Sequence, residues 1–180
     1  RLFEIGKSFH GTLDAPREVV RIAAVASGTT LPEQWGAVSQ AIDFFDIKAD
    51  LLALLKLAGD ASDVAFRPLE HPALQPGQAA AVLRGDNEIG IIGKLHPGVA
   101  KSLDLKRDAY VFEVDALQAL ASAAPVAKPV SRFPVIRRDL AVLVREDVSG
   151  EQLVEAVAAA APELMRDVRI FDIYKGPGIE

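Results

Sequence analysis

A stretch rich in proline and alanine divides the 180-residue sequence into two parts. Residues 123–129 hold two prolines and three alanines, a composition that favours a linker over a helix or a strand. We therefore expect one domain over residues 1–123, a linker over 124–130 and a second domain over 131–180. Each part must then bury a hydrophobic core of its own.

The composition is that of a folded globular protein. Half of the residues are hydrophobic and 25% are charged, which argues against disorder. The absence of cysteine excludes a disulfide scaffold, a thiolate zinc site and a cysteine nucleophile. No apolar run approaches the roughly 18 residues that span a bilayer, so we expect a cytoplasmic protein. Because the sequence does not begin with methionine, we also expect it to be part of a longer protein.

The first part predicts a sheet with a few helices. Apolar and β-branched runs predict strands over residues 2–5, 17–27, 66–69, 79–83, 89–95 and 110–114. The strand at 17–27 should be buried, and the short strand at 2–5 is expected to pair outside this chain. Residues 71–78 form a predicted loop, and 79–83 with 89–95 form a hairpin. Two short helices are predicted over 98–103 and 115–122.

The clearest helix is predicted over residues 44–55. Its apolar positions recur at steps of three and four and comprise Phe44, Ile47, Leu51, Leu54 and Leu55. Asp43 can cap the start and Gly59 can end the helix. Metal ligation or acid catalysis is an alternative role for Asp43, Asp46 and Asp50, but a cap and an acidic first turn are favoured.

The sequence offers no cofactor or metal motif. Gly90 and Gly93 lie in a predicted strand and outside any phosphate-binding pattern, so they should allow close packing. The three histidines, His10, His71 and His96, are not at ligand spacing. We therefore predict no metal, cofactor or catalytic residues in this chain.

The second part predicts a β-α-β unit. A strand over residues 140–144 is followed by a helix that Ser149 and Gln152 open as a capping box and Pro162 closes. A second strand covers residues 168–174. Its alternation places Ile170, Asp172 and Tyr174 on one face and Phe171 and Ile173 on the other.

A basic cluster precedes this unit. Residues 128–145 hold one acid, Asp139, in a chain whose net charge is −5. The basic residues are Lys128, Arg132, Arg137, Arg138 and Arg145. Such a reversal of sign can mark a surface that faces a polyanion. Charge alone favours the simpler alternative, in which the arginines pair with acids elsewhere in the fold.

Eight short motifs in order resemble the bacterial phenylalanine-tRNA ligase β subunit, in its carboxy-terminal part. They are Trp35 and residues 43–48, 72–78, 91–97, 110–113, 131–134, 137–141 and 171–174. The resemblance covers essentially the whole chain. Two departures are Gln75, where a histidine is expected, and Ala49, where a glycine is usual.

For the first part, the resemblance implies a class II synthetase-like module, an antiparallel sheet with flanking helices, that has lost its chemistry. The arginine signatures that clamp ATP phosphates are absent from the sequence. The implied partner is the α subunit, which holds ATP, magnesium and phenylalanine in an α2β2 heterotetramer that charges tRNA(Phe). This chain alone should be inactive. The 44–55 helix is then either a subunit interface or ordinary core.

For the second part, the resemblance implies the first half of a ferredoxin-like anticodon-binding domain, giving an α+β protein. Asp172 and Tyr174 then hold the first anticodon base, and Ala141 is small enough to let the base approach. We expect weaker, non-specific contacts with the tRNA backbone from the basic residues Lys128, Arg132, Arg137 and Arg138. In a ferredoxin-like sheet the first and second strands are not neighbours, because the third strand lies between them. The strands predicted at 140–144 and 168–174 should therefore have unpaired edges, unless a second copy of the chain or further residues complete the sheet.

Two other functions stay open. Residues 1–123 could keep a hydrolytic or adenylate-forming activity that uses His71 and His96 with nearby carboxylates. The chain could also be a free-standing β-α-β ligand-binding or interaction module unrelated to tRNA.

Overall fold

The computed structural model describes residues 1–59, 61, 63–121, 132–176 and 178. The chain divides into two compact units, Arg1–Ala127 and Lys128–Glu180. The predicted linker, residues 124–130, lies outside the described residues.

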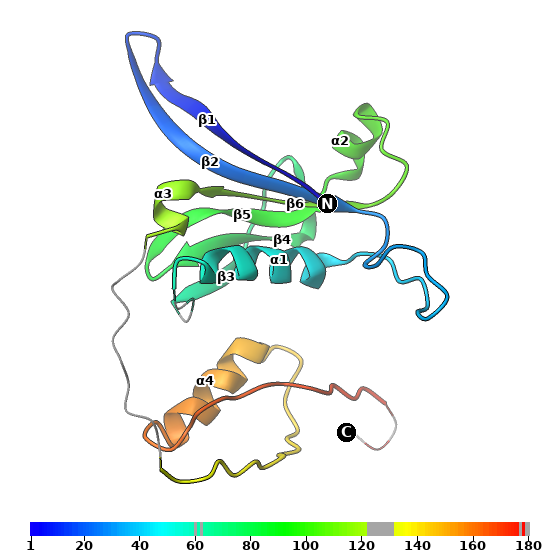
Figure 1. Ribbon diagram of the computed structural model, residues 1–180, viewed down its shortest axis with the longest axis vertical. Coiled ribbons are helices and arrows are strands. Elements are labelled where there is room, and N and C mark those ends of the chain that lie inside the picture. The colour runs from blue at the N-terminus through cyan, green and yellow to red at the C-terminus, as the bar shows by residue number, and fades with distance from the viewer. Residues whose placement is uncertain (60, 62, 122–131, 177, 179–180) are drawn as a thin grey trace. The chain divides into compact units, whose positions relative to one another are not determined.

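The first unit is built on one six-stranded antiparallel sheet with the order β1-β2-β6-β5-β4-β3 (Figure 1). The strands are β1 (Leu2–Thr12), β2 (Ala15–Ser27), β3 (Val64–Pro68), β4 (Leu74–Arg84), β5 (Asn87–Leu95) and β6 (Ala109–Asp115). The helices are α1 (Phe44–Lys56), α2 (Pro97–Ser102) and α3 (Ala116–Ala119). With helices beside an antiparallel sheet, the unit is α+β, as predicted.

The strands β1 and β2 form a long hairpin that projects beyond the other strands (Figure 1). The prediction of a short strand at 2–5 with an outside partner was wrong, because the ladder runs from Leu2 opposite Val25 to Thr12 opposite Ala15. Gly6 does not end the strand but pairs with Arg21. The strand β2 is also less buried than predicted, since its first four residues are exposed.

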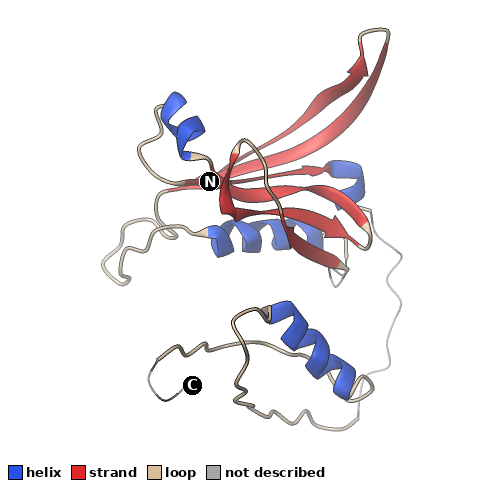
Figure 2. Ribbon diagram, turned by 180° about the vertical axis from the view of Figure 1, so that it is seen from behind, coloured by secondary structure: helices blue, strands red, loops and turns tan. Residues whose placement is uncertain are grey.

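The helix α1 lies along one face of the sheet and closes the core (Figure 2). Its residues Ile47, Leu51 and Leu55 are fully buried, and each such side chain contributes about 1.5–3 kcal/mol through burial. The sheet residues in the same cluster include Ile22, Val82, Ile92, Phe112 and Val114. The apolar stripe of α1 is therefore core, while Phe45 on its flank is exposed.

The N-cap residue Asp43 and the two aspartates of α1, Asp46 and Asp50, have structural partners. The Asp43 carboxylate accepts hydrogen bonds from the backbone N–H groups of Phe45 and Asp46, at 2.7 and 3.1 Å, and Asp46 accepts one from the Asp43 N–H at 2.8 Å. This capping box confirms the predicted start of the helix. Asp50 pairs with Arg1 at 2.6 Å.

The hairpin of β4 and β5 is longer than predicted. Strand β4 starts at Leu74, inside the predicted loop 71–78, and an irregularity between Leu74 and Ala79 lets the ladder pass the proline and the glycine. The two glycines of β5 are needed for packing. A Cβ on Gly90 would overlap the backbone of β6 at Glu113, and a Cβ on Gly93 would lie 2.8 Å from the backbone oxygen of Gln78.

The two short helices carry distinct end structures. The Asp115 carboxylate caps α3, which ends at Ala119 and so is shorter than the predicted helix at 115–122. At the end of α2, the Leu105 N–H donates to the Ala100 carbonyl at 2.9 Å. Asp104 between them has a φ of 54°, the left-handed conformation of this type of helix end.

The second unit has α4 (Gly150–Ala160) as its regular element within residues 132–176. The predicted capping box is confirmed, because Ser149 Oγ accepts from Gln152 N–H and the Gln152 side chain accepts from Ser149 N–H. The segments 140–144 and 168–174 were predicted as strands with unpaired edges; neither has a ladder to any described residue, so neither is a paired strand in this structure. A strand needs a hydrogen-bonded neighbour, whatever its side-chain pattern.

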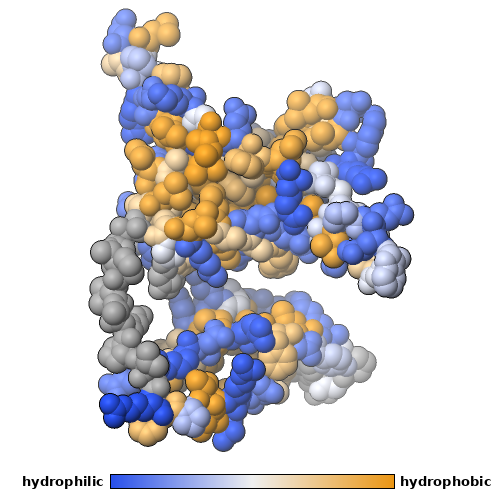
Figure 3. Space-filling model, viewed as in Figure 1, coloured by the Kyte–Doolittle hydropathy of each residue, from blue (hydrophilic) through white to orange (hydrophobic). Residues whose placement is uncertain are grey.

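The apolar residues of these two segments lie at the surface. Leu140, Val142 and Leu143 are 64–71% exposed, and Phe171 and Ile173 are 69% and 76% exposed. Figure 3 shows hydrophobic side chains at the surface of both units. Among the described residues, no helix is long and apolar enough to cross a membrane.

Candidate nucleic-acid interface

The predicted base-binding pair lies on the surface of the second unit. Asp172 is exposed and Tyr174 is 62% exposed, so both side chains are accessible to a nucleotide. A Cβ on Gly176 would lie 2.6 Å from the Tyr174 hydroxyl oxygen. The glycine thus leaves space into which the phenol folds.

Ala141, the third predicted residue, is also exposed. It lies in the segment 140–144, and no β-ladder of the described residues joins this segment to 168–174. Backbone pairing therefore does not position Ala141 beside Asp172 and Tyr174. The helix α4 does approach the second segment, because a Cβ on Gly150 would lie 3.2 Å from Ile170 Cδ1.

A single ion pair connects the residues that follow the two segments, 140–144 and 168–174. The Lys175 ammonium donates to the Glu146 carboxylate at 3.0 Å. The hydrogen bond and the positive charge of Lys175 hold the pKa of Glu146 below its ordinary value. Both side chains are exposed, so this pair orients the chain more than it stabilises the fold.

The basic cluster divides into two groups. Arg145 forms two hydrogen bonds with Asp147, at 3.0 and 2.8 Å. This arginine therefore pairs with an acid, as the simpler alternative predicts. Arg132, Arg137 and Arg138 are exposed and have no ion pair with a described residue. Their charge is available to a phosphate. Lys128 lies outside the described residues.

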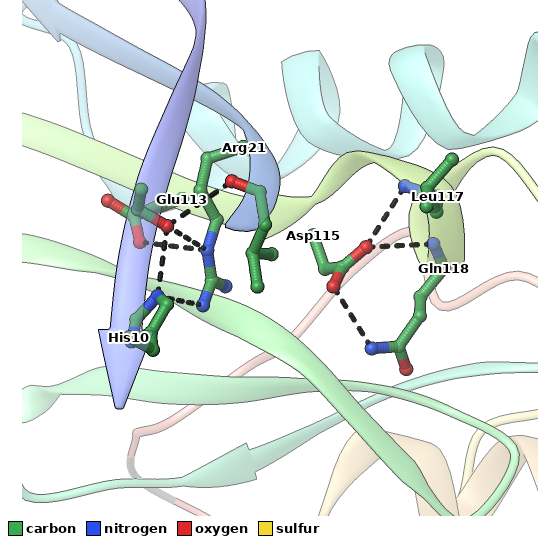
Figure 4. A network of polar contacts seen from close by, with 8 residues as sticks. His10, Arg21, Glu113, Asp115, Leu117 and Gln118 are labelled. Carbon is green, nitrogen blue, oxygen red and sulfur yellow. Dashed lines mark hydrogen bonds and ion pairs between the residues drawn. The ribbon is translucent and has the colours of Figure 1, made fainter. Parts of the chain in front are cut away.

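The first unit carries a polar cluster that the sequence analysis missed (Figure 4). Arg21 of β2 approaches Ser8 and His10 of β1 at 3.4 and 3.5 Å and Glu113 of β6 at 3.8 Å. Ser8 Oγ and His10 Nε2 are 2.9 Å apart. The available signal was the alternation along β2 and β6, which puts Arg17 with Arg21 on one face of β2 and Glu113 with Asp115 on one face of β6.

Asp115 lies at the end of β6, beside this cluster (Figure 4). Partial burial opposes ionisation, but hydrogen bonds from Gln118 and Leu117 and the charge of Arg21 outweigh it and lower the pKa of Asp115. The carboxylate accepts from the Leu117 and Gln118 N–H groups at 3.0 and 3.1 Å and from the Gln118 side-chain amide at 3.2 Å. Asp115 is thus committed to capping α3.

The histidines proposed for a residual activity serve local structure. His71 Nδ1 accepts a hydrogen bond from Ala73 N–H at 3.2 Å, and His96 Nδ1 accepts one from Gly98 N–H at 3.0 Å. Among the residues that the structure describes, no group of three or more potential ligands could hold a metal ion.

Two family models match the chain, one for each unit. The phenylalanyl tRNA synthetase beta chain CLM domain matches residues 1–116, and the ferredoxin-fold anticodon binding domain matches residues 131–180. The second match confirms the family predicted for the second part, although the described residues of that unit lack the strands.

Curated relatives align with the whole chain. Phenylalanine–tRNA ligase beta subunits of Pseudomonas syringae pv. tomato, Methylococcus capsulatus and Nitrosococcus oceani are 42%, 43% and 37% identical to it. In each case 100% of this chain is covered, but it spans only 23% of the relative's length. On these matches, the chain belongs to the phenylalanyl-tRNA synthetase β chain family, which its motifs resemble.

Proposed function

We propose that this chain is a non-catalytic portion of a cytoplasmic enzyme that attaches phenylalanine to tRNA(Phe) with ATP. Residues 1–123 are a class II synthetase-like scaffold that packs on a catalytic α subunit, and residues 131–180 bind the tRNA anticodon, with 124–130 as linker. ATP and Mg²⁺ are held by the α subunit of an α2β2 heterotetramer, and this chain alone is inactive. The family membership supports this function over a free-standing module unrelated to tRNA.

The observation that carries the proposal is the exposure of an aromatic ring and an acid within a segment matched by an anticodon-binding family model. Tyr174 presents a planar phenol on which a base can stack, which is worth about 1–3 kcal/mol. The Asp172 carboxylate can accept from two neighbouring donors. Guanine offers such a pair, N1–H and N2–H, on its Watson–Crick edge, so guanine is the proposed first anticodon base.

The remaining predicted residues have supporting roles in this proposal. Ala141 has no side chain beyond Cβ and would let the base approach the sheet. Arg132, Arg137 and Arg138 are exposed cations without an ion pair to a described residue, and together with Lys128 they would attract the tRNA backbone without reading its sequence. A neighbouring strand would complete the sheet beside residues 140–144 and 168–174.

The test is tRNA(Phe) binding and charging by the full α/β enzyme with single substitutions in the β subunit. Tyr174→Ala should weaken tRNA binding about 10-fold through loss of stacking, while Tyr174→Phe should retain most of the affinity. Asp172→Asn should also weaken binding, because an amide nitrogen replaces one acceptor. Asp167→Asn is the matched control, an exposed carboxylate outside the proposed site.

Pyrophosphate exchange with ATP and phenylalanine, without tRNA, should be unchanged in all these α/β enzymes, because the proposed site for ATP and phenylalanine lies in the α subunit. Wild-type tRNA affinity in both Tyr174→Ala and Asp172→Asn would remove the anticodon assignment. Exchange by the isolated β chain would remove the assignment of residues 1–123 as an inactive scaffold.

A further inference from the structure

The Trp35 loop, residues 28–42 between β2 and α1, presents apolar side chains to solvent. Leu31 is 55% exposed and Val38 95% exposed, and Trp35, the single tryptophan of the chain, is fully exposed. Figures 1 and 2 show the loop projecting beyond the start of α1. Trp35 is one of the residues on which the family resemblance rests, yet it takes no part in the core cluster of the first unit. The packing of this unit therefore does not explain it.

The base of the Trp35 loop is fixed by backbone hydrogen bonds. The Thr30 N–H donates to the Gln40 carbonyl at 2.9 Å. The Ile42 N–H donates to the Gly28 carbonyl at 3.0 Å, and the Ile42 side chain is buried in the core. A loop that is closed in this way loses less conformational entropy when its tip binds a partner, because part of the ordering is already present.

The charge of the loop argues against a nucleic acid as its partner. Residues 28–42 carry one charged side chain, the acid Glu33. Sites that stack bases on aromatic rings combine those rings with a positively charged groove, because the phosphates supply much of the affinity. An exposed tryptophan without cations is typical instead of protein–protein interfaces, where tryptophan is enriched among the residues that dominate the binding energy.

The cavities of the first unit do not suit the Trp35 of a second copy of this chain. Among the described residues, the cavities beside Lys94 and beside Arg21, of about 310 and 390 Å³, are lined mainly by charged and polar side chains. An indole placed there would separate those groups from water without offering them hydrogen bonds in return. The partner of the loop should instead supply an apolar pocket.

We propose that the Trp35 loop docks on the catalytic α subunit, with Trp35 in an apolar pocket and with Leu31 and Val38 packed around it. This inference rests on the proposed function, which places residues 1–123 against the α subunit, and it names the surface that makes the contact. A buried tryptophan contributes about 150–250 Å², a substantial part of the roughly 800 Å² that one partner buries in an interface of standard size.

Hydroxyl-radical footprinting, read by mass spectrometry of the peptide that contains Trp35, tests the contact in the full enzyme. Oxidation of Trp35 should be rapid in the isolated full-length β subunit and several-fold slower in the α/β enzyme before tRNA is added. Equal oxidation in both overturns the inference. Protection in the isolated β subunit also overturns it, since another part of that subunit or a second copy would then cover the loop. Protection that appears only with tRNA(Phe) overturns it as well.

Substitutions in the β subunit measure what the contact contributes. Trp35→Ala should weaken the association of α with β about 30-fold or more, as expected for a dominant interface residue. Trp35→Phe should weaken it less, because an aromatic ring remains. Leu117→Ala is the matched control, since Leu117 is an apolar side chain of α3 that is 77% exposed and lies outside the loop. Urea unfolding of the β subunit should be unchanged by Trp35→Ala, so that weaker association reports the interface.

The inference and the proposed function fail in different ways. If the native β subunit does not bind an α subunit at all, the proposed function is wrong and the inference fails with it. If Trp35→Ala binds α as tightly as the native β subunit does, the inference is wrong while the proposed function stands.

Discussion

Lys175 and Glu146 form an ion pair of 3.0 Å that joins the chain just after residues 168–174 to the chain just after residues 140–144. The two segments flank α4 in the sequence, as the strands of a β-α-β unit do. Parallel strands of such a unit end at the same edge of a sheet. The pair therefore keeps the carboxy-terminal ends of both segments close together, as in a β-α-β unit, even though the segments have no ladder to a described residue.

Titration of Glu146 provides the first prediction. Because Lys175 lowers the pKa of Glu146 in the folded protein, the stabilisation from this pair is present above the ordinary pKa and is lost as the pH falls through the lowered value. NMR titration of the 180-residue chain should find the pKa of Glu146 below that of an ordinary glutamate, because Lys175 donates a hydrogen bond and supplies a positive charge. Lys175→Gln should restore the ordinary value, and so should high salt. An unchanged titration in Lys175→Gln would contradict the pairing.

Arg84 should be the most important arginine for the stability of the first unit. Its side chain is 11% exposed, and its guanidinium donates to the carbonyls of Ala119 and Ala121 at 2.7 and 2.8 Å at the end of α3. Arg84→Ala should lower the free energy of unfolding by about 2–3 kcal/mol, because the carbonyl of the buried residue Ala119 and that of Ala121 lose a charged donor. Urea unfolding measures the change.

Two further variants separate the contacts of Arg84 from its charge. Arg84→Lys should recover only part of the stability, since an ammonium cannot reach several carbonyls at once in the geometry of a fork. Arg67→Ala removes an arginine that is 65% exposed and should change stability by no more than about 0.5 kcal/mol. Equal effects of Arg84→Ala and Arg67→Ala would contradict the role of Arg84.

Gly90 should not tolerate a side chain. A Cβ at this position would overlap the carbonyl oxygen of Glu113, and the atoms in its way belong to the backbone of β6. Gly90→Ala should destabilise the first unit by about 3 kcal/mol or more, because β5 and β6 must separate. Gly36→Ala is the control, since no atom lies within 4 Å of the added Cβ. Thermal unfolding of both variants should show a large loss for Gly90→Ala alone.

Asp104 offers a stabilising substitution. Its φ of 54° at the end of α2 is a conformation in which residues with a Cβ are strained. Asp104→Gly should raise the free energy of unfolding by roughly 0.5–1 kcal/mol, while Asp104→Ala should lower it by a similar amount. The opposite order of the two variants in urea unfolding would show that the side chain of Asp104 matters more than its backbone.

Features that depend on neighbours in the sequence could be predicted from the sequence. The capping boxes of Asp43 with Asp46 and of Ser149 with Gln152 join residues three apart, so their geometry is set once a helix begins. The apolar stripe of α1 and the close packing at Gly90 were also predictable, since periodicity and the lack of a side chain are properties of the sequence itself.

The candidate sites were predictable only in part. The motifs around Asp172 and Tyr174 indicated the family, and the structure adds that both residues are accessible. Alternation along each strand could show which residues share a face, but not that Arg21, His10 and Glu113 meet, because they come from three strands whose register is known only from the ladders.

The sequence by itself determined which segments can be helix or strand, which residues cap them and which family the chain resembles. Tertiary structure decided that β1 pairs with β2 over its whole length, whereas residues 140–144 and 168–174 have no ladder to a described residue. The reason is that a helix satisfies its backbone hydrogen bonds within itself, while a strand, and any site built across a sheet, depends on which neighbour supplies the other half of each bond.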